Sequence, residues 1–556
     1  MQTRAAVVVS LTASAALVGS EAGAQTAGLR LGLAPLTHKV LKHNPVAALP
    51  AEGIELWGAR GEKLSVQLVL TAGRGGLEDV QVSLTQPPRA VDGSPEASLP
   101  VELFRVAYVP DPAHAAARDT HIERWQEELK DPNTDAYPDP LPPLSGPLEL
   151  TAGENQPVWV KVAIPDDCRS GEYRGELTVS AAGTAQPVPL RVHVWPFTLP
   201  STPSLRTAFG NWPSPTALEG VQADSPEQQR LAARYYETLL AHRISGYYLP
   251  QPVNTPEGVA YARDPRVTSF LAGGPDLEAL EAHGLLAQAL FYPGDEPLAR
   301  EQYESLQAAG RLLHEQNPDA AIVTPFWGRG YDDNSPVDLL TGTTSVWVPQ
   351  TSLYLEDAKV REQLLQRKAL GEQVWTYVCC GPGGAYCNFF THMEGIRHRL
   401  LFWQVRQAQL DGLLYWSTQY WERVNPWESM ETYQMPDGST FFGDGSLLYP
   451  GKPVGVEGPV SSQRLECILA GMQDVEYFEL LRRAEGEAAV QQALGEMVTD
   501  FVTYSLDEEK LEQVRRRIGE RLAAVARAAQ PASGFGPGCC GTTTDPFGEW
   551  EPAGQD

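Results

Sequence analysis

Two adjacent carboxylates, Asp295 and Glu296, follow an apolar run that ends in Leu290-Phe291-Tyr292. A pair of acids at the end of a buried strand has the chemistry of a general acid and base acting on a sugar. With 70 acidic residues among 556, about nine adjacent acidic pairs are expected by chance, so position matters more than the pair itself. Other pairs, such as Asp332-Asp333, lie in polar segments typical of a solvated surface. Asp295 and Glu296 are therefore the candidate catalytic residues.

Aromatic residues fall at the ends of the proposed strands. They are Tyr292, Trp327, Trp347, Tyr377 and Trp416. A single buried aromatic residue usually only packs in a core. Several at equivalent strand ends instead predict a pocket, because flat apolar sugar faces stack on rings while carboxylates bind hydroxyls. We take these five as candidate substrate-binding residues.

The elements that must position these residues alternate between strand and helix in the second half of the chain. The strand candidates are 206–209, 245–249, 287–292, 321–327, 345–348, 374–378 and 412–416, and helical stretches lie near 226–241, 298–315, 357–370 and 394–410. An eighth strand could follow Gly443, whereas 250–285 is loop-rich and weakly patterned. This rhythm predicts a (β/α)8 TIM-like barrel, with further helices over 462–483 and 485–529.

The first part of the chain has a different rhythm. Short runs with apolar residues at alternate positions recur at 64–70, 80–84, 158–162 and 190–194. Repeated short strands of this kind are typical of a β-sandwich. Three prolines between Trp195 and Pro203 interrupt sheet pairing and mark the expected linker. The predicted fold class is multidomain β plus α/β, with an N-terminal β-sandwich, the barrel and C-terminal helices.

Length and charge limit what the protein binds. A chain of 556 residues is too long for one hydrophobic core, so we expect at least two domains. The net charge of −27 disfavours nucleic acid and anionic membrane surfaces, which need clustered Lys and Arg. A neutral glycan or glycoconjugate is the expected partner, with no membrane insertion, and we expect no cofactor.

The first residues are typical of a secretion signal. Arg4 precedes an apolar stretch from Ala5 to Val18, and Ala22-Gly23-Ala24 offers a cleavage site before Gln25. The stretch is shorter than the ~20 residues of a membrane-spanning helix, so a signal is preferred to an anchor. We expect a secreted or periplasmic protein. Its expected parts are a signal peptide at 1–24, a β-sandwich domain at 25–200, a catalytic domain with C-terminal helices at 201–530 and a Gly/Pro-rich tail at 531–556.

The seven cysteines are an odd number, so at least one thiol is left over or paired elsewhere. The adjacent pairs Cys379-Cys380 and Cys539-Cys540 could each close a vicinal disulfide, or the two pairs could cross-link. A zinc site at Cys379, Cys380 and Cys387 is the alternative, but adjacent thiols followed by a six-residue gap do not match the usual ligand spacing. We expect no metal, and the disulfide pattern stays open.

Longer motifs connect these residues to a known family. They are 377–382 (YVCCGP) with 388–390, 411–416 (DGLLYW) with Tyr420-Trp421 and Asn425-Pro426-Trp427, 443–451 (GDGSLLYPG), 464–477, and in the sandwich 159–165 with 171–175. Through these motifs the chain resembles glycoside hydrolase family 123, a group of exo-acting N-acetyl-β-galactosaminidases and their relatives. The resemblance extends over nearly the whole mature chain.

The resemblance implies a β-sandwich ahead of a catalytic barrel, and retaining hydrolysis of a terminal β-linked N-acetylhexosamine, most of all N-acetylgalactosamine. It also implies that the substrate's own 2-acetamido group attacks the anomeric carbon through an oxazolinium intermediate, without a protein nucleophile. The family's acid pair maps onto Asp295, which would orient the acetamido group, and Glu296, the general acid and base. By resemblance and position, further substrate-binding candidates are Tyr415, Trp416, Asn425 and Trp427.

Two other functions stay open. One is a glycosidase of different sugar specificity on the same scaffold. The other is a non-catalytic carbohydrate-binding surface protein, in which the acid pair only hydrogen-bonds a ligand. A loop held by its own aromatic packing is an equal explanation for Asn425 and Trp427. The sequence leaves the sugar, its linkage, the oligomeric state and catalytic competence open.

Overall fold

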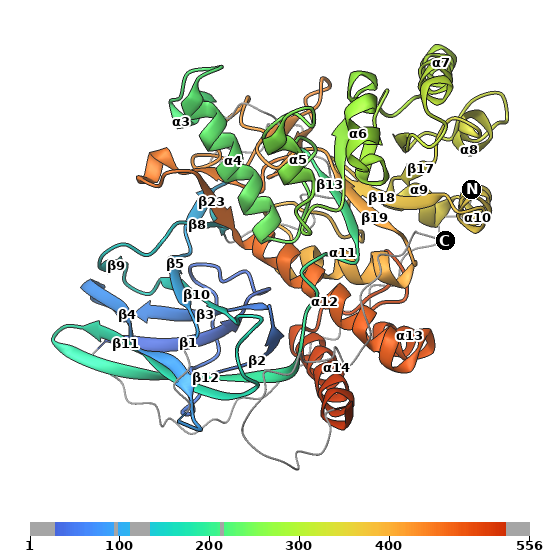
Figure 1. Ribbon diagram of the computed structural model, residues 1–556. Coiled ribbons are helices and arrows are strands. Elements are labelled where there is room, and N and C mark those ends of the chain that lie inside the picture. Colours follow the sequence, from blue (N-terminus) through green and yellow to red (C-terminus); the bar gives the residue numbers. More distant parts are fainter. Residues whose placement is uncertain (1–27, 94–97, 112–133, 212–215, 530–556) are drawn as a thin grey trace, which may run out of the picture.

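The computed structural model describes residues 28–93, 98–111, 134–211 and 216–529. The expected signal peptide, the Gly/Pro-rich tail and Cys539-Cys540 lie outside the described residues. The rest of the chain forms a part built of β-sheets, a part in which strands and helices alternate, and a group of C-terminal helices beside both (Figure 1).

The first part consists of two β-sheets that share one hydrophobic core. One sheet has the strand order β1-β3-β10-β5 and the other β2-β12-β11-β4-β9. Paired strands are antiparallel except β2 and β12, which run parallel. The strands are β1 Leu29–Pro35, β2 Ile54–Arg60, β3 Lys63–Ala72, β4 Leu77–Ala90, β5 Val101–Arg105, β9 Leu148–Leu150, β10 Asn155–Ala163, β11 Gly171–Ala181 and β12 Thr184–Thr198.

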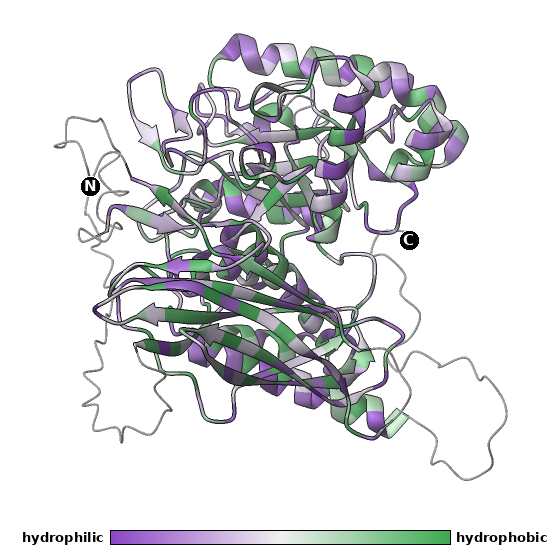
Figure 2. Ribbon diagram, turned by 90° about the vertical axis from the view of Figure 1, so that its left-hand side faces the viewer, coloured by the Kyte–Doolittle hydropathy of each residue, from purple (hydrophilic) through white to green (hydrophobic). Residues whose placement is uncertain are grey.

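The core of this part comes from alternate residues of facing strands. Val158, Val160 and Val162 of β10 lie in the same buried cluster as Leu177 and Val179 of β11, on the other sheet. Successive side chains of a strand point to opposite faces, so an alternating apolar pattern buries one face. Figure 2 shows hydrophobic and hydrophilic residues following one another along these strands.

The predicted linker at 195–203 begins too early. Strand β12 continues to Thr198 and still pairs with Arg60 of β2 after an irregularity that follows Val194. Its pairing with β11 ends at Val194, so Pro196 interrupts no hydrogen-bond ladder on that side. The prolines are therefore tolerated in the end of a strand.

In the second part, parallel strands alternate with helices. The strands are β13 Arg206–Phe209, β14 Phe270–Ala272, β15 Ala289–Phe291, β16 Val323–Phe326, β17 Val346–Pro349, β18 Gln373–Val378 and β19 Gly412–Tyr415. The helices are α3 Thr216–Glu219, α4 Pro226–Ala241, α5 Pro256–Ala262, α6 Leu277–His283, α7 Arg300–Gln316, α8 Pro336–Leu340, α9 Thr351–Glu356, α10 Ala358–Ala369 and α11 Gly395–Gln407, with short 3-10 turns at Gly274–Asp276 and Leu286–Gln288.

These strands are connected in a closed order. One sheet has the order β13-β19-β18-β17-β16 and a second pairs β14 with β15. A parallel bridge from Phe291 to Ile322 links β15 to the chain entering β16. At the other side, Gly246 bridges to Phe209 of β13, and the next carbonyl, that of Tyr247, accepts a hydrogen bond from Leu271 N of β14 (2.7 Å).

Six of the seven strand candidates match these elements, while 245–249 forms only an isolated bridge at Gly246, and two other predictions are wrong. The missing unit is β14, which lies inside the 250–285 segment that we interpreted as loop-rich. After Gly443 the next strand is the two-residue β22, which belongs to a separate small sheet with β23 and β8. A three-residue strand such as β14 is too short to give a periodic signal.

Small sheets and C-terminal helices complete the described chain. The small strands are β6 Tyr108–Pro110, β7 Ala136–Pro138, β8 Pro140–Leu141, β20 Tyr433–Gln434, β21 Thr440–Phe441, β22 Tyr449–Pro450 and β23 Pro459–Ser462, with a 3-10 turn at Lys452–Val454. The helices are α12 Gln463–Glu485, α13 Glu487–Gly495 and α14 Glu508–Ala529, so the helix predicted over 485–529 is interrupted between Gly495 and Glu508. No described helix combines the length and hydropathy needed to cross a membrane.

Helix α12 connects the sheets to the parallel strands and their helices through buried charges. Glu466 accepts a hydrogen bond from Lys161 of β10 (2.9 Å) and lies 2.9 Å from Nε2 of His242, which ends α4. These opposite charges lower the pKa of Glu466 although burial raises it. A buried carboxylate is tolerated here because the Lys161 ammonium donates to it and the His242 ring lies within hydrogen-bonding distance.

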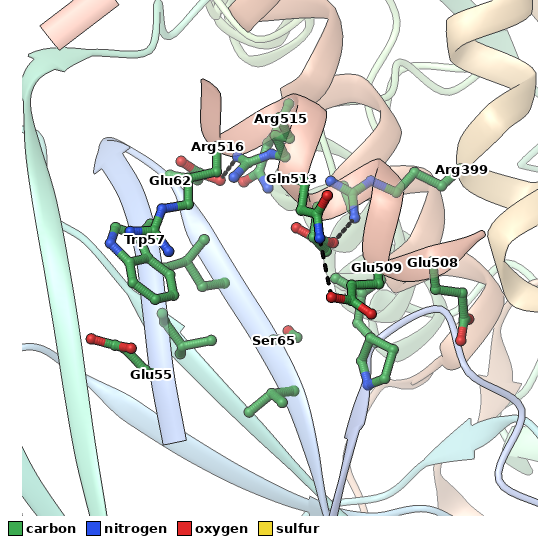
Figure 3. A pocket seen from close by; sticks show the side chains of 18 of the residues that line it. Glu55, Trp57, Glu62, Ser65, Arg399, Glu508, Glu509, Gln513, Arg515 and Arg516 are labelled. Atoms are coloured by element: carbon green, nitrogen blue, oxygen red, sulfur yellow. Dashed lines mark hydrogen bonds and ion pairs between the residues drawn. The ribbon is translucent and has the colours of Figure 1, made fainter. Parts of the chain in front are cut away.

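A second group of charges extends this interface. Asp474 of α12 accepts hydrogen bonds from Arg399 of α11 (2.6 Å) and from Arg515 of α14 (2.8 Å). Arg515 also pairs with Glu62, which lies between β2 and β3 and accepts a hydrogen bond from Tyr477 (2.7 Å). Glu62, Arg399 and Arg515 of this network line a cavity of about 660 Å³ between β2, β3 and α14 (Figure 3).

The interface predicts that removing its central cation is costly. Replacing Arg515 by Met keeps apolar volume but leaves Glu62 buried without its cation, so we expect a loss of about 3 to 5 kcal/mol in unfolding free energy. Arg517→Met is the matched control, because Arg517 is exposed and its pair with Glu496 is a surface pair, for which we expect less than about 1 kcal/mol. Thermal unfolding midpoints of both variants test this, and equal midpoints would contradict it.

Candidate active site

The carboxyl ends of the parallel strands bring candidate residues to one edge. The turn after β15 carries Asp295 and Glu296. Trp327 directly follows β16, and Tyr377 is the next-to-last residue of β18. Because these strands are parallel, their carboxyl ends face the same side, where loops can build a site.

Glu296 is held by side chains from two other strands. The hydroxyl of Tyr377 donates to its Oε1, and Nε1 of Trp327 donates to its Oε2 (3.1 Å). Its backbone amide donates to the carbonyl of Pro325 in β16 (3.2 Å). The φ of Glu296 is +42°, a region that L residues rarely adopt and that is concentrated at functional sites. Four constraints therefore fix the direction of one carboxylate.

Asp295 lies beside it in a more open position. The hydroxyl of Tyr292 donates to Oδ1 of Asp295 (2.7 Å), and the Tyr292 ring packs edge-on against Tyr247. The side chain of Asp295 is exposed on one side, whereas Glu296 is half-buried. The glycine before the pair, Gly294, leaves no room for a side chain, because a Cβ there would lie 2.8 Å from Cδ2 of Leu306 in α7.

The surroundings favour the protonated form of both acids. Burial raises the pKa of Glu296, and the charge of Asp295 raises it further, while the hydrogen bonds from Tyr377 and Trp327 act in the opposite direction. Burial also raises the pKa of Asp295, and the hydrogen bond from Tyr292 opposes it. Raised carboxyl pKa values in a polar cluster of this kind are typical of acid–base sites.

Trp347 does not reach this site. It is fully buried, its Nε1 donates to Glu372 (2.6 Å), and it belongs to the core on the helix side of its strand. Its neighbours Val346 and Val348 lie in a different cluster, the one that contains Tyr377. Because side chains alternate along a strand, Trp347 must point away from the face that Tyr377 occupies.

Tyr415 and Trp416 serve a neighbouring carboxylate. The Tyr415 hydroxyl and Nε1 of Trp416 both donate to Oδ1 of Asp444 (3.0 and 3.1 Å). Tyr415 is fully buried, whereas Trp416 is half-buried and packs against Tyr420, with ring centroids 5.0 Å apart. Of the two, only Trp416 offers a ring surface to a ligand.

Asn425 and Trp427 hold their own loop. Asn425 donates to Glu428 (2.9 Å) and accepts from the amide of Trp427 (3.1 Å). Nε1 of Trp427 donates to the carbonyl of Pro450 (2.9 Å), and its ring packs on Tyr449. No described contact joins either residue to Asp295 or Glu296. The loop explanation of these two residues fits the structure.

The structure adds residues that sequence reasoning missed. Tyr247 packs on Tyr292, and Asp444 and Tyr433 lie beside Cys379 and Trp416, as their effects on pKa and their ring contacts indicate. The signal for Asp444 was present, because it is the acid in the motif 443–451. Tyr433 follows no strand of the parallel set, so no strand-end rule could find it.

The cysteine pair borders the same region. Cys379 and Cys380 are thiols whose Sγ atoms lie 3.6 Å apart, and Glu296 and Asp444 contribute to raising the pKa of Cys379. Cys387 is buried in the hydrophobic core on the helix side. Within the described ranges, no group of three His, Cys, Asp or Glu side chains could hold a metal ion, so the zinc alternative gains no support.

Comparison with known families gives two matches. The glycoside hydrolase 123 catalytic domain matches residues 275–481, and the glycoside hydrolase 123 N-terminal domain matches residues 38–181. Together they cover more than half of the chain and include both candidate acids. Comparison with curated proteins gives no match.

Comparison with solved structures agrees with the family matches. The structure of a family 123 glycoside hydrolase from Clostridium perfringens, from a study of glycolipid glycan hydrolysis, has a TM-score of 0.67 at 14% identity, covering 90% of this chain and 99% of that one. A β-galacturonidase from Eisenbergiella tayi (TM-score 0.29, 9% identity, 80% of this chain and 71% of that one) and a β-glucuronidase from Parabacteroides merdae (0.26, 11%, 75% and 49%) are more distant.

The raised pKa of Glu296 predicts a pH-dependent effect on stability. Because its folded-state pKa lies above the unfolded value, the folded protein binds the proton more tightly, and stability falls as pH rises through the folded pKa. Glu296→Gln removes this charge and keeps an acceptor for Tyr377. We expect it to raise the thermal midpoint at pH 8 relative to the wild type, with the difference shrinking toward pH 4.

Glu301→Gln is the matched control, since Glu301 is an exposed acid in the first turn of α7. It should shift the midpoint little at either pH. A Glu296→Gln variant that is less stable than the wild type at pH 8 and more stable at pH 4 would show that the carboxylate is not destabilised by its surroundings.

Proposed function

The chain belongs to glycoside hydrolase family 123, and we propose that it removes a terminal β-linked N-acetylhexosamine, with N-acetylgalactosamine as the expected sugar. The observation that carries this proposal is the adjacent pair Asp295 and Glu296, each held by a tyrosine at the carboxyl ends of parallel strands. The glycan of a glycolipid is a candidate substrate, because the similar Clostridium perfringens enzyme was studied on glycolipid glycan hydrolysis.

The reaction that suits this pair uses the substrate as its own nucleophile. In the first step the acetamido oxygen bonds to the anomeric carbon as the glycosidic bond breaks, and Glu296 gives its proton to the leaving oxygen. In the second step water bonds to the anomeric carbon, Glu296 takes the water proton, and the oxazolinium ring reopens. The configuration is retained because the anomeric carbon is attacked twice.

The surroundings of each acid suit its role. Asp295 must be ionised to accept a hydrogen bond from the acetamido N–H as positive charge develops; burial raises its pKa, and the Tyr292 hydroxyl opposes that shift by donating to the ionised form. Glu296 must start protonated, and both burial and the neighbouring Asp295 charge raise its pKa. The spacing rule for two separate catalytic carboxylates does not apply, since no protein nucleophile takes part.

The finer architecture belongs to the same proposal. We regard the closed order of β13 to β19, with the segment around Gly246 as a further unit, as a (β/α)8 barrel, and the two sheets before it as a β-sandwich domain. We also propose export after cleavage before Gln25, which the composition of the first residues supports.

The loss of kcat on removing the general acid should depend on the leaving group. With an aryl N-acetyl-β-galactosaminide, we expect Glu296→Gln to lower kcat by about 100-fold or more, and an alkyl glycoside, whose leaving group needs the proton more, should lose still more. Asp295→Asn should lower kcat about 100- to 1000-fold on both, and Glu301→Gln should match the wild type. Steady-state release of p-nitrophenol and of alcohol measures this.

Three outcomes would contradict the proposal. Full activity of Glu296→Gln would reject the assignment of the acid. Tight binding of N-acetylgalactosamine with no turnover of any aryl glycoside by the wild type would favour a non-catalytic carbohydrate-binding protein. Turnover of aryl glycosides that lack the 2-acetamido group would point to a different sugar specificity and to another nucleophile.

The Tyr377 hydrogen bond predicts a shift in the pH profile. The bond lowers the pKa of Glu296, so Tyr377→Phe should raise it and move the basic limb of the kcat/KM profile to higher pH. The limb set by Asp295 should stay in place. Tyr261→Phe is a control, because Tyr261 of α5 packs against Tyr236. A basic limb that is unchanged or moves to lower pH in Tyr377→Phe would contradict the role of Glu296.

A further inference from the structure

A buried carboxylate near the acid pair has one oxygen without a partner. Asp444 lies between β21 and β22 and is 1% exposed. Its Oδ1 accepts hydrogen bonds from Tyr415 and Trp416 (3.0 and 3.1 Å), but its Oδ2 has no partner among the described residues. A buried acceptor without a donor is destabilising, and native proteins rarely keep one without a reason.

The nearest cation cannot supply the missing donor. Arg464 influences the pKa of Asp444, but its guanidinium is used elsewhere. It donates to the carboxylate of Asp139 (2.9 Å) and to the carbonyls of Phe389 (2.9 Å), Gly443 (2.7 Å) and Ser446. The fold therefore provides donors for one oxygen of Asp444 and leaves the other for something that is not part of the protein.

Asp444 belongs to the same neighbourhood as the acid pair. Tyr377, which donates to Glu296, lies in β18, and Tyr415, which donates to Asp444, lies in the adjacent strand β19, where it pairs with Val378. The two carboxylates are therefore held by different donors, which lie at the carboxyl ends of neighbouring strands.

Aromatic rings adjoin Asp444 in this region. The rings of Trp416, Tyr420 and Tyr433 lie against one another, with centroids 5.0 to 5.8 Å apart, and all three are half-buried. Asp444 raises the pKa of Tyr433, which also lies close to Cys379 and Cys380. Rings next to a carboxylate combine stacking with hydroxyl recognition, the combination that sugars require.

We propose that Oδ2 of Asp444 accepts a hydrogen bond from a hydroxyl of the terminal sugar, and that this residue selects which sugar occupies the site. The inference rests on the proposed function. Since Asp295 and Glu296 act at the anomeric carbon and its acetamido neighbour, Asp444 takes a hydroxyl farther along the ring, at C3, C4 or C6. Three carboxylates in one site also disfavour an anionic sugar.

Binding of the sugar then requires a small rearrangement. The Oδ2 atom is closed off from solvent in the free protein. Tyr433 starts β20 in a two-stranded hairpin outside the parallel strands, and it is the neighbouring ring whose movement the proposal requires. A hydroxyl that reaches Oδ2 supplies the donor that the fold lacks, so it contributes more to the binding free energy than a hydroxyl facing water.

Deoxy substrates test this with the unmodified protein. We would measure kcat/KM of the wild type on an aryl N-acetyl-β-galactosaminide and on its 3-deoxy, 4-deoxy and 6-deoxy analogues. One analogue should fall by about tenfold to a hundredfold relative to the parent, because it leaves Oδ2 unpaired. Equal kcat/KM on all four substrates would overturn the role of Asp444, while absence of turnover of the parent would overturn the proposed function instead.

A variant separates recognition from structural support. Asp444→Asn keeps an oxygen for Tyr415 and Trp416 and replaces Oδ2 by an amide that only donates. We expect it to lose about tenfold or more in kcat/KM on the parent but little on the analogue that the wild type discriminates against. A loss of equal size on all four substrates would make Asp444 a structural residue. Asp437→Asn, an exposed acid between β20 and β21, should match the wild type on every substrate.

Discussion

The hydrogen bond from Tyr377 to Glu296 is the contact on which the candidate site depends. It joins the turn after β15 to β18, two elements that are not neighbours in the sheet order. A carboxylate removed from water needs such a donor, because burial alone would drive it toward the neutral form. The parallel arrangement of the strands makes the contact possible, since it brings the ends of distant strands to one side.

The backbone at Glu296 fits this view. A left-handed φ in a non-glycine residue is unfavourable, and it persists only where surrounding contacts determine it. Here the amide is tied to Pro325 and the side chain to Tyr377 and Trp327. These contacts offset the unfavourable backbone conformation and hold the carboxylate in a fixed direction, so they add less to the stability of the fold than they otherwise would.

The sequence predicted where the strands end better than it predicted the face to which each side chain points. The positions of the strands around the acid pair followed from apolar runs, and the pair itself from its place after one of them. Trp347 was assigned wrongly because a strand-end rule ignores alternation, although Val346 and Val348 on either side already implied the opposite face. Strand β14 was too short for any pattern. Asp444 lay in the motif 443–451, but a single acid in a glycine-rich run has no periodicity, so its hydrogen-bond partners were needed to single it out.

Helix α12 has a consequence for how such proteins change over generations. Its acids face the sheets on one side and α11 and α14 on the other, so each module completes the electrostatics of the other. A gene rearrangement that removed the sheets alone would also remove Lys161, and Glu466 would lose that cation. The two modules are therefore expected to be inherited together.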